Sequence, residues 1–349
     1  MAFEHLSVTK DYGLQAALVA EPLVGDDGVR DNVYNDGSMW NQMFKRFRKQ
    51  ELAGANEFYW PLDLDEMTGE ASYRGADPLS TTQPDTVTAA KVATSEMARQ
   101  VVISERQTDL VRGERAVLAV MLQQQQKAAR QLVKDMDVYL MGDGTDNDSK
   151  RPLGLKIWVA SDPTSSTYAP GDLSQANNTN HRNQTKDNSN TSGNVLSDLI
   201  TAVSASQDGD AGPTWAVGNR AFRNKLEALI GGTGSFYHNP IVQGGGEPGV
   251  GKSGDPSIGK VFYRGIPIYV DANWVQYGTA AGPGQCIFID SSSFILVNAA
   301  ERASTKNFIH WTKMIRGFNQ TAEAGFMRSH FQLACVERRR NLCFFNVAA

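Results

Sequence analysis

The clearest pattern in the chain is a stripe of apolar residues at steps of three, four and seven between Glu114 and Met141. That spacing predicts an amphipathic α-helix. Gly142 follows the stripe, as expected for a C-terminal cap. At 1.5 Å per residue the helix would be roughly 40 Å long, so we expect a structural spine whose stripe packs against the sheet of its own subunit. The stripe consists of Leu118, Leu122, Ala129, Leu132, Met136 and Leu140, with Gln123 to Lys127, Arg130 and Lys134 on the other side.

Two segments before this helix have the character of strands. Between Glu57 and Asp65 apolar and polar residues alternate, and Pro61 indicates an edge strand. A second extended segment runs from Thr86 to Ser104, beyond a polar stretch at 67–85. We therefore predict an extended hairpin with a polar tip. Because a hairpin cannot bury its faces alone, we expect a neighbouring subunit to hold it.

The N-terminal residues 1–56 predict an irregular arm with one short amphipathic segment, Met39 to Gln50. In that segment Trp40, Phe44 and Phe47 recur at helical spacing, with lysines and arginines between them. A small surface helix explains this pattern. A basic and aromatic patch that contacts nucleic acid is the alternative.

The second half of the chain alternates between short elements and loops. Residues 161–194 are dense in Asn, Ser, Thr and Asp, which predicts a long loop or insertion. Helices and strands are predicted after it, and a glycine-rich loop interrupts them at 231–259. The helices are Val195–Ser206 and Arg220–Ile230, and the strand-like runs are Thr214–Val217, Lys260–Val270, Gln285–Ile289, Phe294–Val297, Asn307–Ile315 and Gly325–Phe345.

Composition narrows the class of protein. The 349 residues carry a formal net charge of −4, with 41% hydrophobic and 21% charged residues. Such a chain can bury a core without disulfides, and its mild acidity argues against a protein that coats nucleic acid. The three cysteines, Cys286, Cys335 and Cys343, are too scattered for a disulfide framework and fit a reducing compartment. We expect no export signal and no membrane span.

Two segments match motifs of ligand-binding sites, but the residues around each match do not fit such a site. Residues 246–253 match the phosphate-binding pattern GxxxxGK[ST], but no buried strand precedes them and no helix follows them. Lys252 is therefore expected to lie in a surface loop. The acids from Asp143 to Asp148 suggest a calcium loop, yet Ile157 stands where that loop needs a glutamate. The sequence predicts no catalytic, cofactor-binding or metal-binding residue, and no cofactor.

One tight basic run remains, from Arg338 to Arg340. A solvated or salt-bridged strand end explains it, and contact with a packaged polyanion is the alternative.

Several of these parts, in this order, resemble the major capsid protein of tailed bacteriophages, with the Hong Kong 97-type fold. The most specific likeness is Tyr139-Leu-Met-Gly142-Asp143-Gly144-Thr145 followed by Pro152-Leu-Gly154-Leu155, which is similar to the junction after the family's spine helix. Gly265-Ile-Pro267-Ile-Tyr-Val270 resembles a strand of its axial domain. The arm, the hairpin and the long helix resemble its N-terminal arm, extended loop and spine.

The resemblance implies an α+β fold with five parts. These are an N-terminal arm (1–56), an extended loop (57–104), a peripheral domain with the spine helix and the Asn-rich insertion (105–194), an axial domain (195–300), and strands returning to the peripheral domain (301–349). Three groups of residues are expected to matter. They are subunit contacts at Trp40, Phe44, Tyr59, Trp60, Tyr73, Arg74 and Asp77, the spine core at Leu118, Leu122, Leu132 and Met136, and the junction at Gly142, Asp143, Gly144, Thr145 and Gly154.

The implied function is that of a structural protein, not an enzyme. Copies of the chain would form the pentamers and hexamers of an icosahedral head around double-stranded DNA, assembled in the bacterial cytoplasm. The implied partners are a portal protein at one vertex and, where present, separate scaffolding and decoration proteins, with non-specific contact to the packaged DNA. An encapsulin-like nanocompartment shell and a P-loop enzyme are the alternatives.

Two departures from the family pattern limit what the resemblance implies. No long charged scaffolding segment begins the chain, and the tip at 67–85 contains no lysine for a covalent crosslink between subunits.

Overall fold

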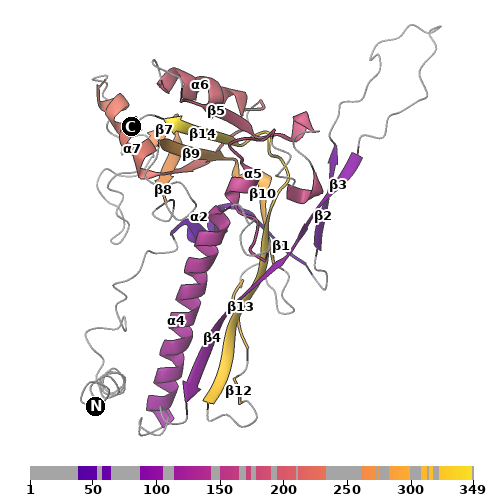
Figure 1. Cartoon of the computed structure of the whole chain (residues 1–349), viewed down its shortest axis with the longest axis vertical. Coiled ribbons are helices and arrows are strands. Elements are labelled where there is room, and N and C mark those ends of the chain that lie inside the picture. Colours follow the sequence, from indigo (N-terminus) through magenta and orange to yellow (C-terminus); the bar gives the residue numbers. More distant parts are fainter. Residues whose placement is uncertain are drawn as a thin grey trace, which may run out of the picture.

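The computed structural model describes residues 38–52, 57–63, 87–104, 114–142, 150–164, 170–173, 178–189, 195–209, 211–232, 261–271, 274, 283–298, 308–312, 314–316 and 322–347. All structural statements below concern these residues. The strands among these residues form two large sheets and one separate hairpin (Figure 1).

The two large sheets have six strands each. We call the first the long sheet, because its central strand β13 is 14 residues long. It comprises β1 (Arg48–Glu51), β4 (Ser95–Ser104), β10 (Phe294–Asn298), β11 (His310–Trp311), β12 (Ile315–Arg316) and β13 (Ala322–Cys335). The second, the upper sheet of Figure 1, has the order β5 (Gln184–Asp187), β14 (Leu342–Val347), β9 (Gly284–Ile289), β6 (Trp215–Gly218), β8 (Ile266–Val270) and β7 (Val261–Tyr263).

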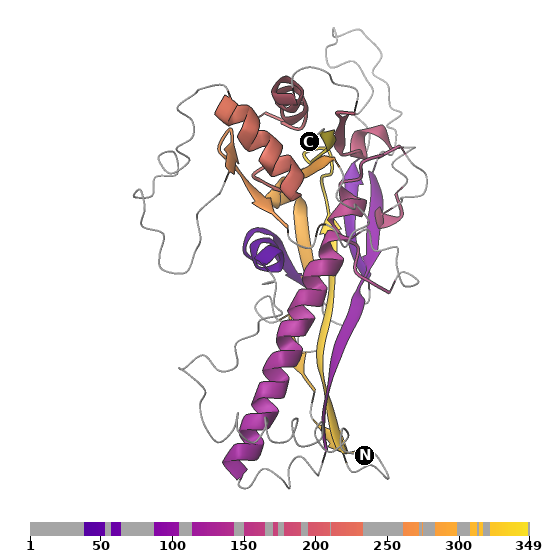
Figure 2. The same cartoon turned by 60° about the vertical axis from the view of Figure 1, so that its left-hand side comes forward.

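Helix α4 spans Glu114–Met141, the boundaries that its apolar stripe predicts. It runs alongside β4 and β13 in both views (Figures 1 and 2). Leu132 and Met136 are buried in the main core, and Ala128 packs with Val101 and Ile103 of β4. The predicted seam is confirmed for this half of the helix. The side chains of Leu118 and Leu122 lie outside the described residues.

The aromatic segment near the N-terminus is shorter and more buried than expected. Helix α2 covers Ser38–Arg46 only, and β1 then pairs in parallel with β10. Met43 and Phe47 are buried, so the predicted surface helix is a core element. The backbone N–H of Trp40 donates to the buried Asp137 carboxylate of α4 at 2.6 Å, which satisfies one amide at the start of α2.

The predicted hairpin forms, but its second arm is short. Strands β2 (Glu57–Asp63) and β3 (Val87–Ala93) pair with each other, and Pro61 sits in this edge pair as predicted. After Thr94 the chain leaves the hairpin, because β4 pairs antiparallel with β13 along its whole length. The inner face, with Phe58, Trp60, Leu62, Ala90 and Val92, belongs to the subunit's own core. For that face the expected cover by a neighbour is wrong.

Two predictions for the chain after α4 also need correction. The Asn-rich segment is not only a loop, since it contains the turns η1 (Pro170–Asp172) and η2 (Thr179–His181), and β5 pairs in parallel with β14. The run predicted from Gly325 to Phe345 is two strands in different sheets, β13 and β14. Helices α6 (Val195–Ala205) and α7 (Arg220–Gly232) pack on the upper sheet, while the short α5 (Leu155–Trp158) follows α4.

The seam of α4 gives a direct test of this packing. Leu132 is buried against the long sheet, so Leu132→Asp places an unpaired carboxylate in an apolar contact. That costs several kcal/mol, against a domain stability of about 5–15 kcal/mol. We expect insoluble protein on expression, whereas Gln126→Asp, on the exposed side of the same helix, stays soluble. Soluble, folded Leu132→Asp protein would contradict the assignment of the seam.

Candidate functional site

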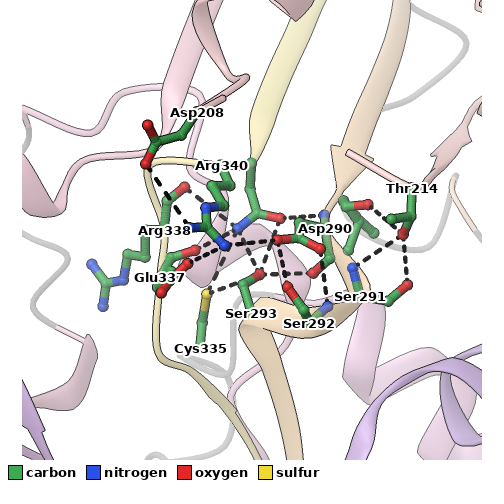
Figure 3. Close-up of polar contacts among 12 residues, drawn as sticks. Asp208, Thr214, Asp290, Ser291, Ser292, Ser293, Cys335, Glu337, Arg338 and Arg340 are labelled. Carbon is green, nitrogen blue, oxygen red and sulfur yellow. Dashed lines mark hydrogen bonds and ion pairs between the residues drawn. The ribbon is translucent and has the colours of Figure 1, made fainter. Parts of the chain in front are cut away.

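Two short connections between the two sheets lie side by side (Figure 3). Strand β9 of the upper sheet leads through the turn η5 (Ser291–Ser293) into β10 of the long sheet. Strand β13 of the long sheet leads back through residues 336–341 into β14 of the upper sheet. The backbone N–H of Val336 donates to Ser293 O at 2.8 Å, which ties one crossing to the other.

Asn341 is the centre of this junction and is fully buried. Its side-chain oxygen accepts a hydrogen bond from the backbone N–H of Asp290 at 2.8 Å. Its amide nitrogen donates to Ser293 Oγ at 3.0 Å and to Glu337 O at 2.9 Å. One side chain thus satisfies buried polar groups from both crossings, which fixes the distance between them.

Charged side chains of both connections also belong to this junction. The buried Asp290 carboxylate accepts from the backbone N–H of Ser292 at 3.0 Å and from its hydroxyl at 2.7 Å, which caps η5. The Arg340 guanidinium lies 2.7 Å from Glu337 and 3.8 Å from Asp290 (Figure 3). Arg340 therefore stabilises the turn that carries it.

Arg338 faces inward from the same turn. Its guanidinium is fully buried, donates to Pro170 O at 2.5 Å and lies 4.7 Å from the ring centre of Trp158. Burial lowers the pKa of Arg338 to about 10. The basic run 338–340 is thus no continuous patch, because Arg338 is internal, Arg340 is salt-bridged and Arg339 alone is exposed. The polyanion interpretation of this run is not supported.

His181 of η2 is buried within reach of the Arg338 charge. Burial, with a smaller contribution from Arg338, lowers the pKa of His181 to about 3. Its Nε2 atom is buried and has no hydrogen-bond partner among the described residues. The imidazole is therefore neutral in the folded protein and joins η2 to the junction as a packing group.

The glycine junction after the spine helix brings two predicted residues together. A Cβ atom on Gly154 would lie 2.6 Å from Tyr139 O and 2.7 Å from Leu140 O, so only glycine fits against the end of α4. The backbone N–H of Lys156 donates to Gly142 O at 3.3 Å. Asp143, Gly144 and Thr145 lie outside the described residues.

The predicted subunit contacts divide into three groups. Trp40 and Trp60 are buried in the core of their own chain, so both are corrected to core residues; Phe44 packs partly buried beside Trp40. Tyr59 is 58% exposed on the outer face of the hairpin. Tyr73, Arg74 and Asp77 lie outside the described residues, as does the P-loop match at 246–253.

Arg46, the last residue of α2, also points into the fold. The Arg46 guanidinium lies 5.6 Å from the ring centres of both Trp215 and Tyr269 and donates to Tyr269 Oη at 2.9 Å. Arg46 therefore clamps the N-terminal segment to the upper sheet, so this arginine is not part of a nucleic-acid patch.

Other kinds of site find no support in the described part of the chain. No group of three or more His, Cys, Asp or Glu side chains gathers there as for a metal ion. None of the described helices has the length and apolar character of a membrane span. Cys286, Cys335 and Cys343 are free and buried, and burial raises the pKa of each thiol, so they are not poised as nucleophiles.

The sequence did not single out Asn341 or His181, and it did not connect either of them with Asp290. Each is an isolated polar residue in a loop or strand end, and no spacing pattern connects positions 181, 290 and 341. Only the folding of β13 and β14 into different sheets brings them together.

Removal of the central amide tests the junction. Asn341→Ala leaves the buried N–H of Asp290 and the partly buried C=O of Glu337 without this partner, and the loss at the buried N–H alone costs about 1–3 kcal/mol. We expect the melting temperature to fall by several degrees, measured by calorimetry on the soluble protein. Thr201→Val, which removes an exposed hydroxyl that donates to Ser197 O within α6, is the control and should change stability little. Equal melting temperatures for both variants would refute the central role of Asn341.

The lowered pKa of His181 predicts that the stability of the fold decreases in acid. The unfolded chain has a pKa near 6.5 at this residue, and the folded chain has about 3. Between these values only the unfolded state binds the proton, so the free energy of unfolding falls as the pH drops from 6.5 towards 3. The slope contributed by His181 is at most about 1.4 kcal/mol per pH unit. Urea unfolding of His181→Gln should show a flatter pH dependence over this window, and an unchanged slope would contradict the prediction.

Comparisons with known proteins bear on this architecture. No protein-family model and no curated protein sequence matches the chain. Solved structures do match. A capsid protein of cyanophage A-1(L) aligns with a TM-score of 0.64 at 11% identity, over 93% of this chain and 96% of the other.

Two further structures align over a similar length. The capsid of a native GTA particle gives a TM-score of 0.59 at 12% identity, over 95% of this chain and 99% of the other. The SrpI encapsulin of Synechococcus elongatus gives 0.54 at 10% identity, over 96% and 95%. In all three comparisons the aligned part exceeds nine tenths of both chains. The chain therefore has the Hong Kong 97-type fold of phage capsid proteins.

Proposed function

We propose that this chain is a major capsid protein that assembles into the pentamers and hexamers of an icosahedral head around double-stranded DNA. The observation that carries the proposal is the extent of the structural likeness, which spans 93% of this chain and 96% of the cyanophage capsid chain. A shell protein needs no catalytic or cofactor site, because contacts between copies of the same fold build the shell. A heterologous contact that closes on itself gives rings of five or six subunits.

Exposed apolar side chains on two sheets support a self-associating protein. On the outer face of the hairpin Tyr59 and Val87 are 58% and 60% exposed. On the long sheet Val102 and Ile315 are exposed, and both stand opposite Ala324 of β13, so they share one face. Exposed apolar groups gathered on one face are typical of protein contacts. We assign both faces to contacts between subunits, together with Phe44, Tyr73, Arg74 and Asp77 as further candidates.

The remaining partners follow from the shell role. A head filled with DNA needs a portal at one vertex, and scaffolding and decoration proteins would be separate chains. The proposed location is the virion capsid, with assembly in the bacterial cytoplasm. We propose no enzymatic activity, no cofactor and no membrane partner.

An encapsulin-like nanocompartment is the second candidate, because the SrpI encapsulin has the same fold. The two functions differ in cargo. Electron microscopy of purified protein tests the shell, and nucleic acid extracted from nuclease-treated particles separates a phage head from a protein compartment. Monodisperse protein without particles would contradict both.

The hairpin tip tests how the shell is held together. Because the inner face of the hairpin is anchored in its own subunit, deletion of residues 67–85 should leave a soluble, folded chain. The deleted variant should fail to form stable shells, since we propose that the tip contacts a neighbouring subunit. Sedimentation and electron microscopy provide the measurement. Particles of normal yield and heat resistance would rule out this role for the tip.

A further inference from the structure

The hairpin joins the long sheet at a short corner between β3 and β4. Strand β3 ends at Ala93, and Thr94 alone separates it from β4. The Gln332 side chain of β13 donates to Ala93 O at 2.7 Å and fixes this corner from one side. Glu96, the second residue of β4, stands directly opposite His330 of β13. Contacts between these two side chains therefore act at the base of the hairpin.

The Glu96 carboxylate is shared by two basic side chains of β13. Its Oε1 atom lies 3.1 Å from Nε2 of His330 and 3.9 Å from Nη1 of Arg328. The shorter approach is the one to the imidazole, yet His330 Nε2 makes no hydrogen bond to any described residue. The attraction between His330 and Glu96 therefore depends on whether the imidazole carries a charge.

The remaining charged groups of these strands define the surroundings of the contact. His310 of β11 stands opposite Arg328, and its ring centre is 5.8 Å from that of His330. A charge on His310 would therefore repel both neighbours. The other carboxylate of β13, Glu323, stands opposite Ile103 at the far end of β4. Within β4, β11 and β13 the contact thus combines one carboxylate, one permanent cation and one imidazole that can become a second cation.

We propose that His330 is a proton-dependent clamp between β4 and β13. Histidine side chains change their charge between about pH 8 and about pH 5. At the upper end of this range Arg328 is the charged partner of the Glu96 carboxylate, at the longer of the two distances. In acid the His330 imidazolium binds the same carboxylate, and opposite charges that face each other on neighbouring strands stabilise the pairing of those strands. The base of the hairpin is thus held more firmly in acid. The clamp belongs to the folded chain and goes beyond the proposed shell function.

A double-mutant cycle of Glu96→Gln and His330→Gln tests the clamp by urea unfolding. The two side chains are 57% and 28% exposed, and exposed ion pairs couple weakly. We expect a coupling of about two- to fivefold in the equilibrium constant for unfolding at about pH 5.5, and none at about pH 8. His181 also affects stability in acid, but it is present in all four proteins, so its contribution cancels in the cycle.

The matched control is a cycle of Arg99→Gln and Asp135→Asn. This ion pair also holds β4, against α4, and contains no histidine. Its coupling should not increase in acid. A coupling between Glu96 and His330 that is absent at both pH values, equal at both or larger at about pH 8 would overturn the proposal. Each of these results leaves the shell function standing, because unassembled protein is measured.

Hydrogen exchange locates the effect within the molecule. The protection factors of the β4 amides should rise when the pH falls from about 8 to about 5.5, relative to those of β9 and β14 in the upper sheet. In Glu96→Gln this rise should disappear, because the imidazolium has lost its carboxylate. An equal rise in both proteins would assign the acid effect to other groups and overturn the clamp.

Discussion

The fold depends on the paired crossings between its two sheets. The position of the long sheet relative to the upper sheet is set where η5 and residues 336–341 lie against each other. A buried amide suits this point, because Asn341 can accept from one crossing and donate to the other at once. An apolar residue of similar size would leave those backbone groups unsatisfied.

Two titratable groups of this junction, Arg338 and His181, are buried, so both depend on the surrounding fold. Arg338 is held by a carbonyl and an aromatic face, and the pKa of the neighbouring His181 is lowered by burial. Removal of a partner would leave the buried Arg338 charge uncompensated, which costs free energy. The segments at 158, 170, 181 and 338 therefore form one unit, with the base of the hairpin packed against it through Trp60 and Trp158.

The proposed shell function requires a chain that has both a fixed core and exposed contact surfaces. The inner face of the hairpin and the described half of the α4 stripe are buried within the chain, so their geometry does not depend on a neighbour. The outer face of the hairpin and one face of the long sheet keep exposed apolar side chains. Such subunits could assemble into a shell through these exposed faces without refolding of the core.

The sequence by itself determined the elements whose pattern is local. The period of α4 gave both of its ends, the alternation from Phe58 to Leu62 gave β2, and the order of short motifs around Gly142, Gly154 and Pro267 indicated the fold. Such patterns survive because each residue's burial there depends on neighbours a few positions away.

Tertiary structure alone decided which strands pair and which polar residues meet. The period-two pattern of residues 86–104 is the same in a hairpin arm as in β4, so only the partner β13 reveals where the hairpin ends. The spacing of Phe47 is helical, yet the chain turns into β1 because β10 offers an open edge. Asn341, Asp290 and His181 have no local signature, since hydrogen bonds across 51 positions depend on the path of the chain and not on sequence spacing.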